Sequence, residues 1–129
     1  MQVNELMAGP VDSCGPQATL AQVARRMTDD DIGSVCVTQD GALIGIITER
    51  DVVRAVADRR QPSHTTVSEL MTPNPDSLEP DISVEDAASW MLAAGYRHLP
   101  VVEGSRVIGM VSMKDLMWAL TDRTPDDGE

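Results

Sequence analysis

The sequence has almost no aromatic side chains. Among 129 residues there is no Phe, and the aromatic residues are Tyr96, Trp90 and Trp118. A nucleic-acid surface built on stacked aromatic rings is therefore not expected. Basic residues are also few, with 10 Lys and Arg against 21 Asp and Glu, which gives a net charge of −11. Because this charge repels phosphate backbones and anionic lipids, we predict neither a nucleic-acid partner nor a membrane partner.

Long apolar runs and cysteine frameworks are absent from the sequence as well. No run of about 18 apolar residues exists, so no transmembrane helix is predicted, and residues 1–10 lack the basic and apolar regions of a signal peptide. Cys14 and Cys36 form no CxxC pair, which favours two buried thiols in a cytoplasmic protein. These cysteines share no metal-ligand spacing with His64 or His98, so no metal site is predicted.

What the sequence does contain is an internal repeat. A shift of 64 positions aligns residues 3–56 with 67–120 without a gap, and 14 of these 54 positions are identical. We interpret the two segments as copies of one duplicated unit. A polar linker at residues 57–66 separates the copies, and residues 121–129 form an acidic tail that we expect to be frayed.

Each copy predicts the order strand, helix, strand, strand, helix. In the first copy these elements are expected at residues 11–14, 19–30, 34–38, 43–48 and 48–58. In the second copy they are expected at residues 76–78, 83–94, 98–102, 107–112 and 112–122. Apolar residues at helical spacing and alternating patterns bounded by turn residues support these assignments. The mixture predicts an α+β fold, a small sheet with helices on one side.

The most specific motif is a glycine, two apolar residues, a hydroxyl residue, two variable residues and an aspartate. It occurs at residues 45–51 and again at 109–115, where a predicted strand runs into a predicted helix. Thr48 and Ser112 fit the N-cap position of these helices. The amide groups and the dipole of a helix N-terminus attract anions, so the motif is suited to a phosphate group.

The aspartate of the motif adds a second chemical possibility. Asp51 and Asp115 lie on the first helical turn, where a carboxylate can accept two hydrogen bonds from a ribose diol. Gly45 and Gly109 would let a ligand or a neighbouring backbone approach closely. The same spacing also fits an approximate capping box with no ligand, and the spacing by itself leaves both interpretations open.

The order of elements, the doubled motif, the Leu-Met pairs at residues 6–7 and 70–71, and the segment 97–102 together resemble a tandem pair of CBS (cystathionine-beta-synthase) domains. The resemblance covers residues 3–120. It implies an α+β fold of two β-α-β-β-α repeats packed around a pseudo-two-fold axis, with two candidate sites in the cleft between the repeats. Such sites take adenosine-containing ligands: AMP, ADP, ATP or S-adenosylmethionine.

The resemblance also assigns roles to residues of this sequence. Ribose and phosphate would be held by Thr48, Asp51, Ser112 and Asp115. The adenine pockets would be lined by Ile32, Gly33 and Ser34 in one copy and by Tyr96, Arg97 and His98 in the other. From the charges of the neighbouring side chains, we further expect phosphate charge to be met by Arg97, His98, Lys114 and Arg50. Because the two strand openings differ in charge and size, we expect the two sites not to be equivalent.

The predicted function is a ligand-sensing regulatory module with no catalytic residue, no metal and no required cofactor. No nucleophile–base pair or Gly-rich phosphate loop suggests an enzyme. Domain pairs of this family commonly dimerise, so the resemblance implies a homodimer. An unidentified effector protein would receive the signal. The alternative is a ligand-independent scaffold for dimerisation or protein interaction. Trp90 and Trp118, which stand where the first copy has Arg26 and Arg54, would mark a partner surface if they point outward.

Overall fold

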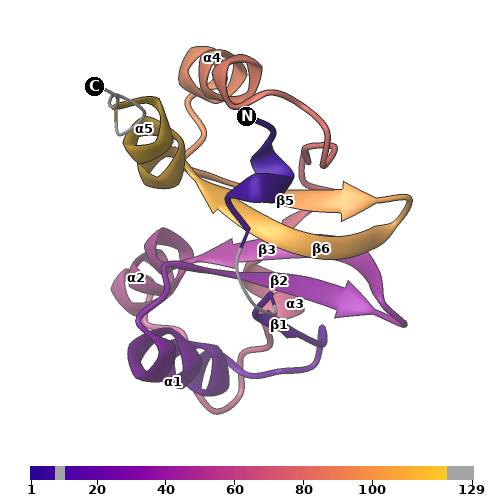
Figure 1. The fold of residues 1–129 in the computed structure, drawn as a ribbon. Coiled ribbons are helices and arrows are strands. Elements are labelled where there is room, and N and C mark those ends of the chain that lie inside the picture. Colours follow the sequence, from indigo (N-terminus) through magenta and orange to yellow (C-terminus); the bar gives the residue numbers. More distant parts are fainter. Residues whose placement is uncertain (8–10, 122–129) are drawn as a thin grey trace. The chain divides into compact units, whose positions relative to one another are not determined.

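The computed structural model describes residues 1–7 and 11–121, which form two compact units (Figure 1). Unit 2 comprises Val11–Pro75, and unit 1 combines the described residues at the N-terminus with those from Asp76 onward. None of the helices in the described segments is long and apolar enough to cross a bilayer. The predicted acidic tail lies outside the described residues, apart from Thr121.

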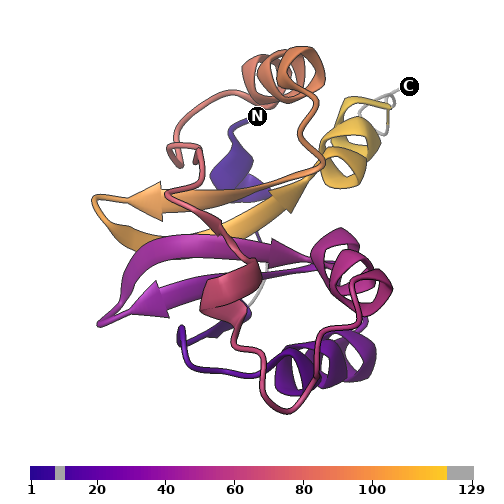
Figure 2. The same ribbon diagram turned by 180° about the vertical axis from the view of Figure 1, so that it is seen from behind.

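Unit 2 is built on an antiparallel hairpin with two helices on one side (Figure 1; from behind in Figure 2). Its elements are β1 (Ser13–Cys14), α1 (Leu20–Asp30), β2 (Ser34–Gln39), β3 (Ala42–Thr48), α2 (Glu49–Ala57), α3 (Val67–Leu70) and β4 (Thr72–Pro73). β1 runs parallel to β2, and β4 pairs antiparallel with β3. The buried core comprises Leu20, Val23, Met27, Val35, Val37, Ile47, Ala55 and Val67.

Unit 1 repeats this plan with a second hairpin and a second pair of helices (Figure 1). Its elements are η1 (Val3–Glu5), α4 (Val84–Ala94), β5 (His98–Glu103), β6 (Arg106–Ser112) and α5 (Met113–Thr121). The strand predicted at residues 76–78 is reduced to a single parallel bridge between Leu78 and Val101. The buried core comprises Val3, Leu78, Val84, Ala87, Ala88, Met91, Leu99, Val101, Val111, Leu116 and Ala119.

The local patterns account for most of these elements, and the predicted α+β class is confirmed. The Thr19 and Ser83 side chains cap α1 and α4 by accepting from the amides of Gln22 and Asp86. Both helices bury the side chains expected from their apolar spacing, such as Met91 in α4. The short elements η1, α3 and β4 were not predicted, because three or four residues carry too little periodic signal.

The leading segment of each sequence repeat, residues 3–7 in the first copy and 67–71 in the second, packs on the body of the other repeat. Val3 is fully buried in the core of unit 1, and its amide donates to the Ile82 carbonyl over 2.9 Å. Val67, its counterpart 64 positions on, is fully buried in unit 2 and donates to the Ala18 carbonyl over 2.8 Å. The compact units and the sequence repeats therefore differ in their leading segments.

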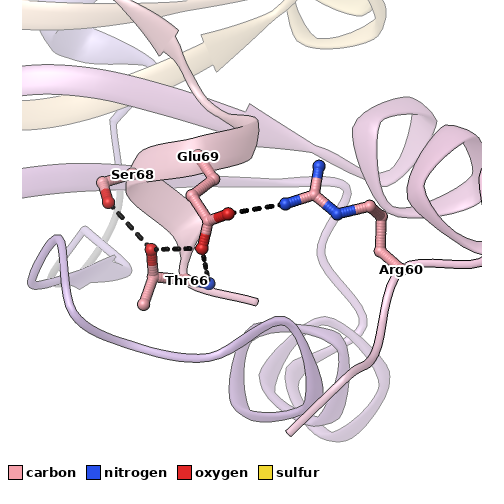
Figure 3. Close-up of polar contacts among 4 residues, drawn as sticks. All are labelled: Arg60, Thr66, Ser68 and Glu69. Atoms are coloured by element: carbon pink, nitrogen blue, oxygen red, sulfur yellow. Dashed lines mark hydrogen bonds and ion pairs between the residues drawn. The ribbon is translucent and has the colours of Figure 1, made fainter. Parts of the chain in front are cut away.

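The segment predicted as a polar linker is tied into unit 2 (Figure 3). The Thr65 carbonyl accepts from the Leu20 amide over 2.8 Å. The Arg60 guanidinium contacts Glu69 over 2.6 Å, and the other oxygen of that carboxylate accepts from the Thr66 amide over 3.0 Å. The backbone and hydroxyl hydrogen bonds from Thr66, aided by the Arg60 charge, hold the pKa of Glu69 below its usual value. The linker thus fixes the start of α3.

The ends of α1 and α4 offer a matched test of backbone strain. Gly95 caps α4 at φ +80°, whereas Asp31 caps α1 at φ +54°. A methyl group on Gly95 would contact nothing within 4 Å, so Gly95→Ala is expected to cost about 1 kcal/mol from backbone strain alone. Asp31→Gly is expected to stay within about 0.5 kcal/mol of the original, because relief of strain is offset by a freer unfolded chain. Urea unfolding of both variants checks this, and equal losses would contradict it.

Candidate functional site

In unit 2 the hydroxyl and the carboxylate of the motif meet at the start of α2. Asp51 Oδ2 accepts from the Thr48 amide over 2.9 Å and from Thr48 Oγ1 over 3.1 Å. The Asp51 amide donates back to Thr48 Oγ1 over 3.3 Å. These bonds form a reciprocal capping box that fixes the half-buried carboxylate. No partner for Asp51 Oδ1 is found among residues 1–7 and 11–121, so this oxygen can still accept from a ligand.

Unit 1 repeats this arrangement at the start of α5. Asp115 Oδ2 accepts from the Ser112 amide over 3.2 Å, and the Asp115 amide donates to Ser112 Oγ over 3.0 Å. Asp115 is exposed, whereas its counterpart in unit 2 is half-buried. The two carboxylates are therefore held alike by the backbone but differ in their access to water.

The hairpins bring the two strand openings to these helix starts. In unit 2, Ser34 lies opposite Thr48 in the β2–β3 ladder, and the Gly33 carbonyl accepts from the Glu49 amide over 2.9 Å. Ile32 precedes them and packs against the core of the unit. The strand opening and the helix start, which are about 15 positions apart in the sequence, are therefore neighbours in space.

The same pairing occurs in unit 1. His98 lies opposite Ser112 in the β5–β6 ladder, and the Arg97 carbonyl accepts from the Met113 amide over 2.8 Å. The predicted site residues thus gather in two groups, one in each unit. Unit 2 holds Ile32, Gly33, Ser34, Thr48, Arg50 and Asp51, and unit 1 holds Tyr96, Arg97, His98, Ser112, Lys114 and Asp115.

The helix starts are less open to an anion than the sequence suggests. In α2 the Glu49 and Asp51 amides already donate to the Gly33 carbonyl and to Thr48 Oγ1. In α5 the amides of Met113 and Asp115 are used in the same way. Phosphate charge would therefore depend more on side chains, namely the exposed Arg50 in unit 2 and the exposed Arg97 and Lys114 in unit 1.

Tyr96 has partners that sequence analysis missed. Its hydroxyl donates to the Asp76 carboxylate, and this bond raises the pKa of the Tyr96 phenol. The Trp90 ring meets the Tyr96 ring edge-on, with centroids 5.9 Å apart and an interplanar angle of 71°. At the position of Tyr96 the first repeat has Ile32, which has no polar group. The two groups therefore differ in chemistry.

The glycines of the motif have a different role from the predicted one. A methyl group on Gly109 would overlap Met7 Sδ and stand 2.8 Å from Met7 Cγ. A methyl group on Gly45 would overlap Met71 Sδ and stand 2.9 Å from Met71 Cγ. The space above each glycine is occupied by a methionine of a leading segment rather than by a ligand or a backbone. In each unit the methionine of a Leu-Met pair and the glycine of the motif thus form one packing contact.

Burial disfavours the reactive thiolate form of both cysteines. Cys36 is fully buried, and burial raises the pKa of its thiol to about 12, with a smaller contribution from Cys14. Burial also raises the pKa of Cys14. Within the described part of the chain, no three His, Cys, Asp or Glu side chains are placed to hold a metal ion.

Comparison with known proteins gives a consistent result. The family model of the CBS domain matches residues 3–58 and 67–122. The CBS domain-containing protein YhcV of Bacillus subtilis is 31% identical over 114 residues, which cover 88% of this chain and 81% of that protein. An uncharacterised 17.7 kDa protein of Acidianus ambivalens is 35% identical over 123 residues, which cover 94% of this chain and 74% of the relative.

Solved structures share the fold. The CBS-domain containing protein ATU1752 from Agrobacterium tumefaciens has a TM-score of 0.82 and 31% identity, covering 93% of this chain and 99% of that one. The CBS domain protein PAE2072 from Pyrobaculum aerophilum, complexed with AMP, has a TM-score of 0.82 and 25% identity, covering 89% of each chain.

Proposed function

Since the chain belongs to the CBS-domain family and carries two such domains in tandem, we propose that it is a regulatory module that binds an adenosine-containing ligand. AMP, ADP, ATP and S-adenosylmethionine are the candidates. The observation that carries this proposal is the doubled hydroxyl–aspartate pair. In each repeat a carboxylate is fixed by a helix cap through Oδ2, and Oδ1 remains able to accept from a ribose diol.

The two groups of residues suit different parts of a ligand. In unit 1, Arg97 and Lys114 are exposed beside Asp115, and Tyr96 and His98 add rings at the same strand opening. We therefore propose that a phosphorylated ligand prefers this group. The group in unit 2 has Arg50 as its cation and the small residues Gly33 and Ser34 at its opening. The AMP complex of the Pyrobaculum aerophilum relative supports adenine nucleotide as the ligand class.

The proposed ligand changes the protein without being changed itself. A ligand that binds one arrangement of the chain better than another shifts the population toward that arrangement. We propose that the chain is no enzyme, needs no cofactor, forms a homodimer, and passes its signal to an effector protein in the cytoplasm. The exposed Trp118, with 63% of its surface accessible, supports an interaction surface on α5.

Thermal unfolding with each candidate ligand tests the proposal. At ten times the dissociation constant, one bound ligand is expected to stabilise the chain by about 1.4 kcal/mol. This corresponds to a rise of about 4–7 °C in the unfolding midpoint. The matched control is the double variant Asp51→Asn, Asp115→Asn, because an amide oxygen keeps the helix cap but lacks the carboxylate's charge. The control is expected to unfold near the original midpoint and to lose the ligand-induced rise.

The absence of a rise with every ligand would overturn the sensor proposal. The second candidate function, a ligand-independent scaffold, would then stand. It is favoured by the observation that the capping boxes of α2 and α5 give the hydroxyl–aspartate pattern a structural role without any ligand. For a scaffold, the unfolding midpoint is expected to be the same with and without ligand, both in the original protein and in the Asp51→Asn, Asp115→Asn variant.

A further inference from the structure

One face of helix α5 in unit 1 is exposed along its whole length. Lys114, Trp118 and Thr121 are four and three residues apart, so their side chains share one side of the helix. Trp118 is 63% exposed and Met117 beside it is 50% exposed, whereas Leu116 on the opposite side is buried in the core of the unit. We call this face the α5 stripe. It runs from the last residue of the helix back to the first turn.

The α5 stripe leads to two cations, Lys114 and Arg97. The Arg97 carbonyl accepts from the Met113 amide over 2.8 Å, which places Arg97 at the start of α5, where Lys114 also lies. Both side chains are exposed, and within residues 1–7 and 11–121 neither of them forms an ion pair. The two cations are therefore available to carboxylate or phosphate groups.

The part of the chain that follows the α5 stripe carries the complementary charge. We call residues 122–129, which lie outside the described residues, the acidic segment. It contains four acidic residues and one basic residue, namely Asp122, Asp126, Asp127 and Glu129 with Arg123. The helical rise between Lys114 and Thr121 is about 10 Å. An extended chain from Thr121 to Asp127 covers about 20 Å, so the acidic segment is long enough to turn back and reach Lys114.

We propose that the acidic segment turns back along the α5 stripe, covers Trp118 and places the carboxylates of Asp126 and Asp127 on Lys114 and Arg97. A phosphorylated ligand in unit 1 needs the same two cations, so the segment and the ligand exclude each other. The ligand would displace the segment and uncover Trp118 for a partner. The contact concerns unit 1 alone, whereas its regulatory consequence rests on the proposed function.

The covalent connection makes weak contacts sufficient for this competition. A single exposed ion pair is weak when it joins separate molecules. A segment of the same chain, however, acts at an effective concentration in the millimolar range. The ligand then binds only the fraction of molecules whose cations are free, and its apparent dissociation constant rises in inverse proportion to that fraction. The acidic segment would thus set the ligand concentration at which the module responds.

Zero-length cross-linking of the full chain without ligand tests the contact. Lys114 is the single lysine in the sequence, so it provides the one side-chain ε-amine. A carbodiimide joins this amine to a neighbouring carboxylate as an amide, and the water lost in that step converts the carbodiimide to a urea. Peptide mapping is expected to find Lys114 joined to Asp126 or Asp127. The yield is expected to fall at least about threefold in about 0.5 M salt, because salt screens exposed ion pairs.

A displaced lysine is the matched control for this experiment. The variant Lys114→Arg, Ala93→Lys keeps a cation on the α5 stripe and moves the amine to an exposed position on α4 of the same unit. An undocked segment would reach both amines, whereas a docked segment is expected to give at least about fivefold less cross-linked product in this variant. A mixture of isotopically light and heavy protein shows whether the joined peptides come from one chain.

Neutralising the acidic segment tests the competition with ligand. In the variant Asp126→Asn, Asp127→Asn, Glu129→Gln, the dissociation constant of ATP is expected to fall about threefold, because the two cations are no longer occupied by carboxylates. Titration calorimetry on the full chain measures this change.

The matched charge control is the variant Glu79→Gln, Asp81→Asn, Glu103→Gln. It removes the same number of negative charges from exposed positions of unit 1 outside the acidic segment. Its dissociation constant for ATP is expected to stay within about 1.5-fold of the original, because salt screens the effect of distant exposed charges.

The contact and the competition can fail separately. The contact would be overturned by the absence of a cross-link between Lys114 and the acidic segment, by equal yields in the displaced-lysine variant, or by cross-links that join only light to heavy chains. An unchanged dissociation constant for ATP after neutralisation would overturn the competition. If no variant bound ATP, the proposed nucleotide ligand would be wrong, and the cross-link would still test the contact.

Discussion

Val3→Asp is expected to lower the midpoint of thermal unfolding by about 10–15 °C, the largest effect predicted for a single substitution in this chain. Val3 is fully buried in the core of unit 1, where it packs in the same cluster as Leu78 and Val84. A carboxylate placed there has no partner, and burying it or opening the core costs about 3–4 kcal/mol. For a chain of this length each kcal/mol corresponds to about 3–5 °C.

The probes in the sequence allow this effect to be assigned to one unit. Both tryptophans lie in unit 1 and both cysteines lie in unit 2. With the pKa of Cys36 raised to about 12 by burial, almost no thiolate exists at pH 8 while unit 2 is folded, so alkylation of Cys36 reports opening of that unit. In Val3→Asp the tryptophan fluorescence transition is expected to move to lower urea, with a smaller change in Cys36 alkylation.

The matched variant is Val67→Asp, at the equivalent position of the second repeat. Val67 is fully buried in unit 2, so this variant is expected to accelerate Cys36 alkylation more than it moves the tryptophan transition. Asn4→Asp adds the same charge at an exposed neighbour of Val3 and should change stability by less than about 0.5 kcal/mol. If Val3→Asp accelerated Cys36 alkylation more than it moved the tryptophan transition, the first leading segment would pack on the body of its own repeat. That result would contradict the packing described above.

Gly109→Ala is expected to destabilise the chain by about 2 kcal/mol, although alanine is normally acceptable in a strand. The added methyl group overlaps Met7 Sδ, and the methionine has to leave its rotamer or move the leading segment. Gly45→Ala meets Met71 in the same way and is expected to behave alike. Urea unfolding measures both losses.

Shortening the methionine provides the rescue. In Met7→Ala, Gly109→Ala the overlapping atoms are gone, so the two substitutions together are expected to cost less than the sum of the two single costs. Gly15→Ala is the control, because a methyl group there meets nothing within 4 Å. A fully additive double variant would show that the methionine and the glycine do not share one packing contact.

These contacts also bear on the proposed ligand site. Gly109 lies in β6, three residues before Ser112, and Gly45 lies three residues before Thr48 in β3. Each leading segment therefore packs against the strand that ends at the hydroxyl residue of the hydroxyl–aspartate pair. A ligand bound at that pair would stabilise a strand whose support comes from the other sequence repeat.

Local patterns in the sequence were sufficient to predict the long helices α1, α2, α4 and α5 and the strands of the two hairpins. Thr19 and Ser83 stand directly before an apolar helical period, where a hydroxyl satisfies a free amide, and the structure shows both as caps. The hydroxyl–aspartate pair was recognisable because its two members are three residues apart and meet within one helical turn. The repeat itself followed from identities at a fixed spacing, which need no knowledge of the fold.

Contacts between residues far apart in the sequence were determined only by tertiary packing. The Tyr96 hydroxyl bonds to Asp76, and nothing in either local sequence marks the other as its partner. Val3 and Val67 stand in nearly identical segments, so the sequence alone does not say which repeat body each segment joins. The structure places each on the body of the other repeat, where a methionine fits over a glycine and the valine becomes fully buried, and this burial removes apolar surface from water.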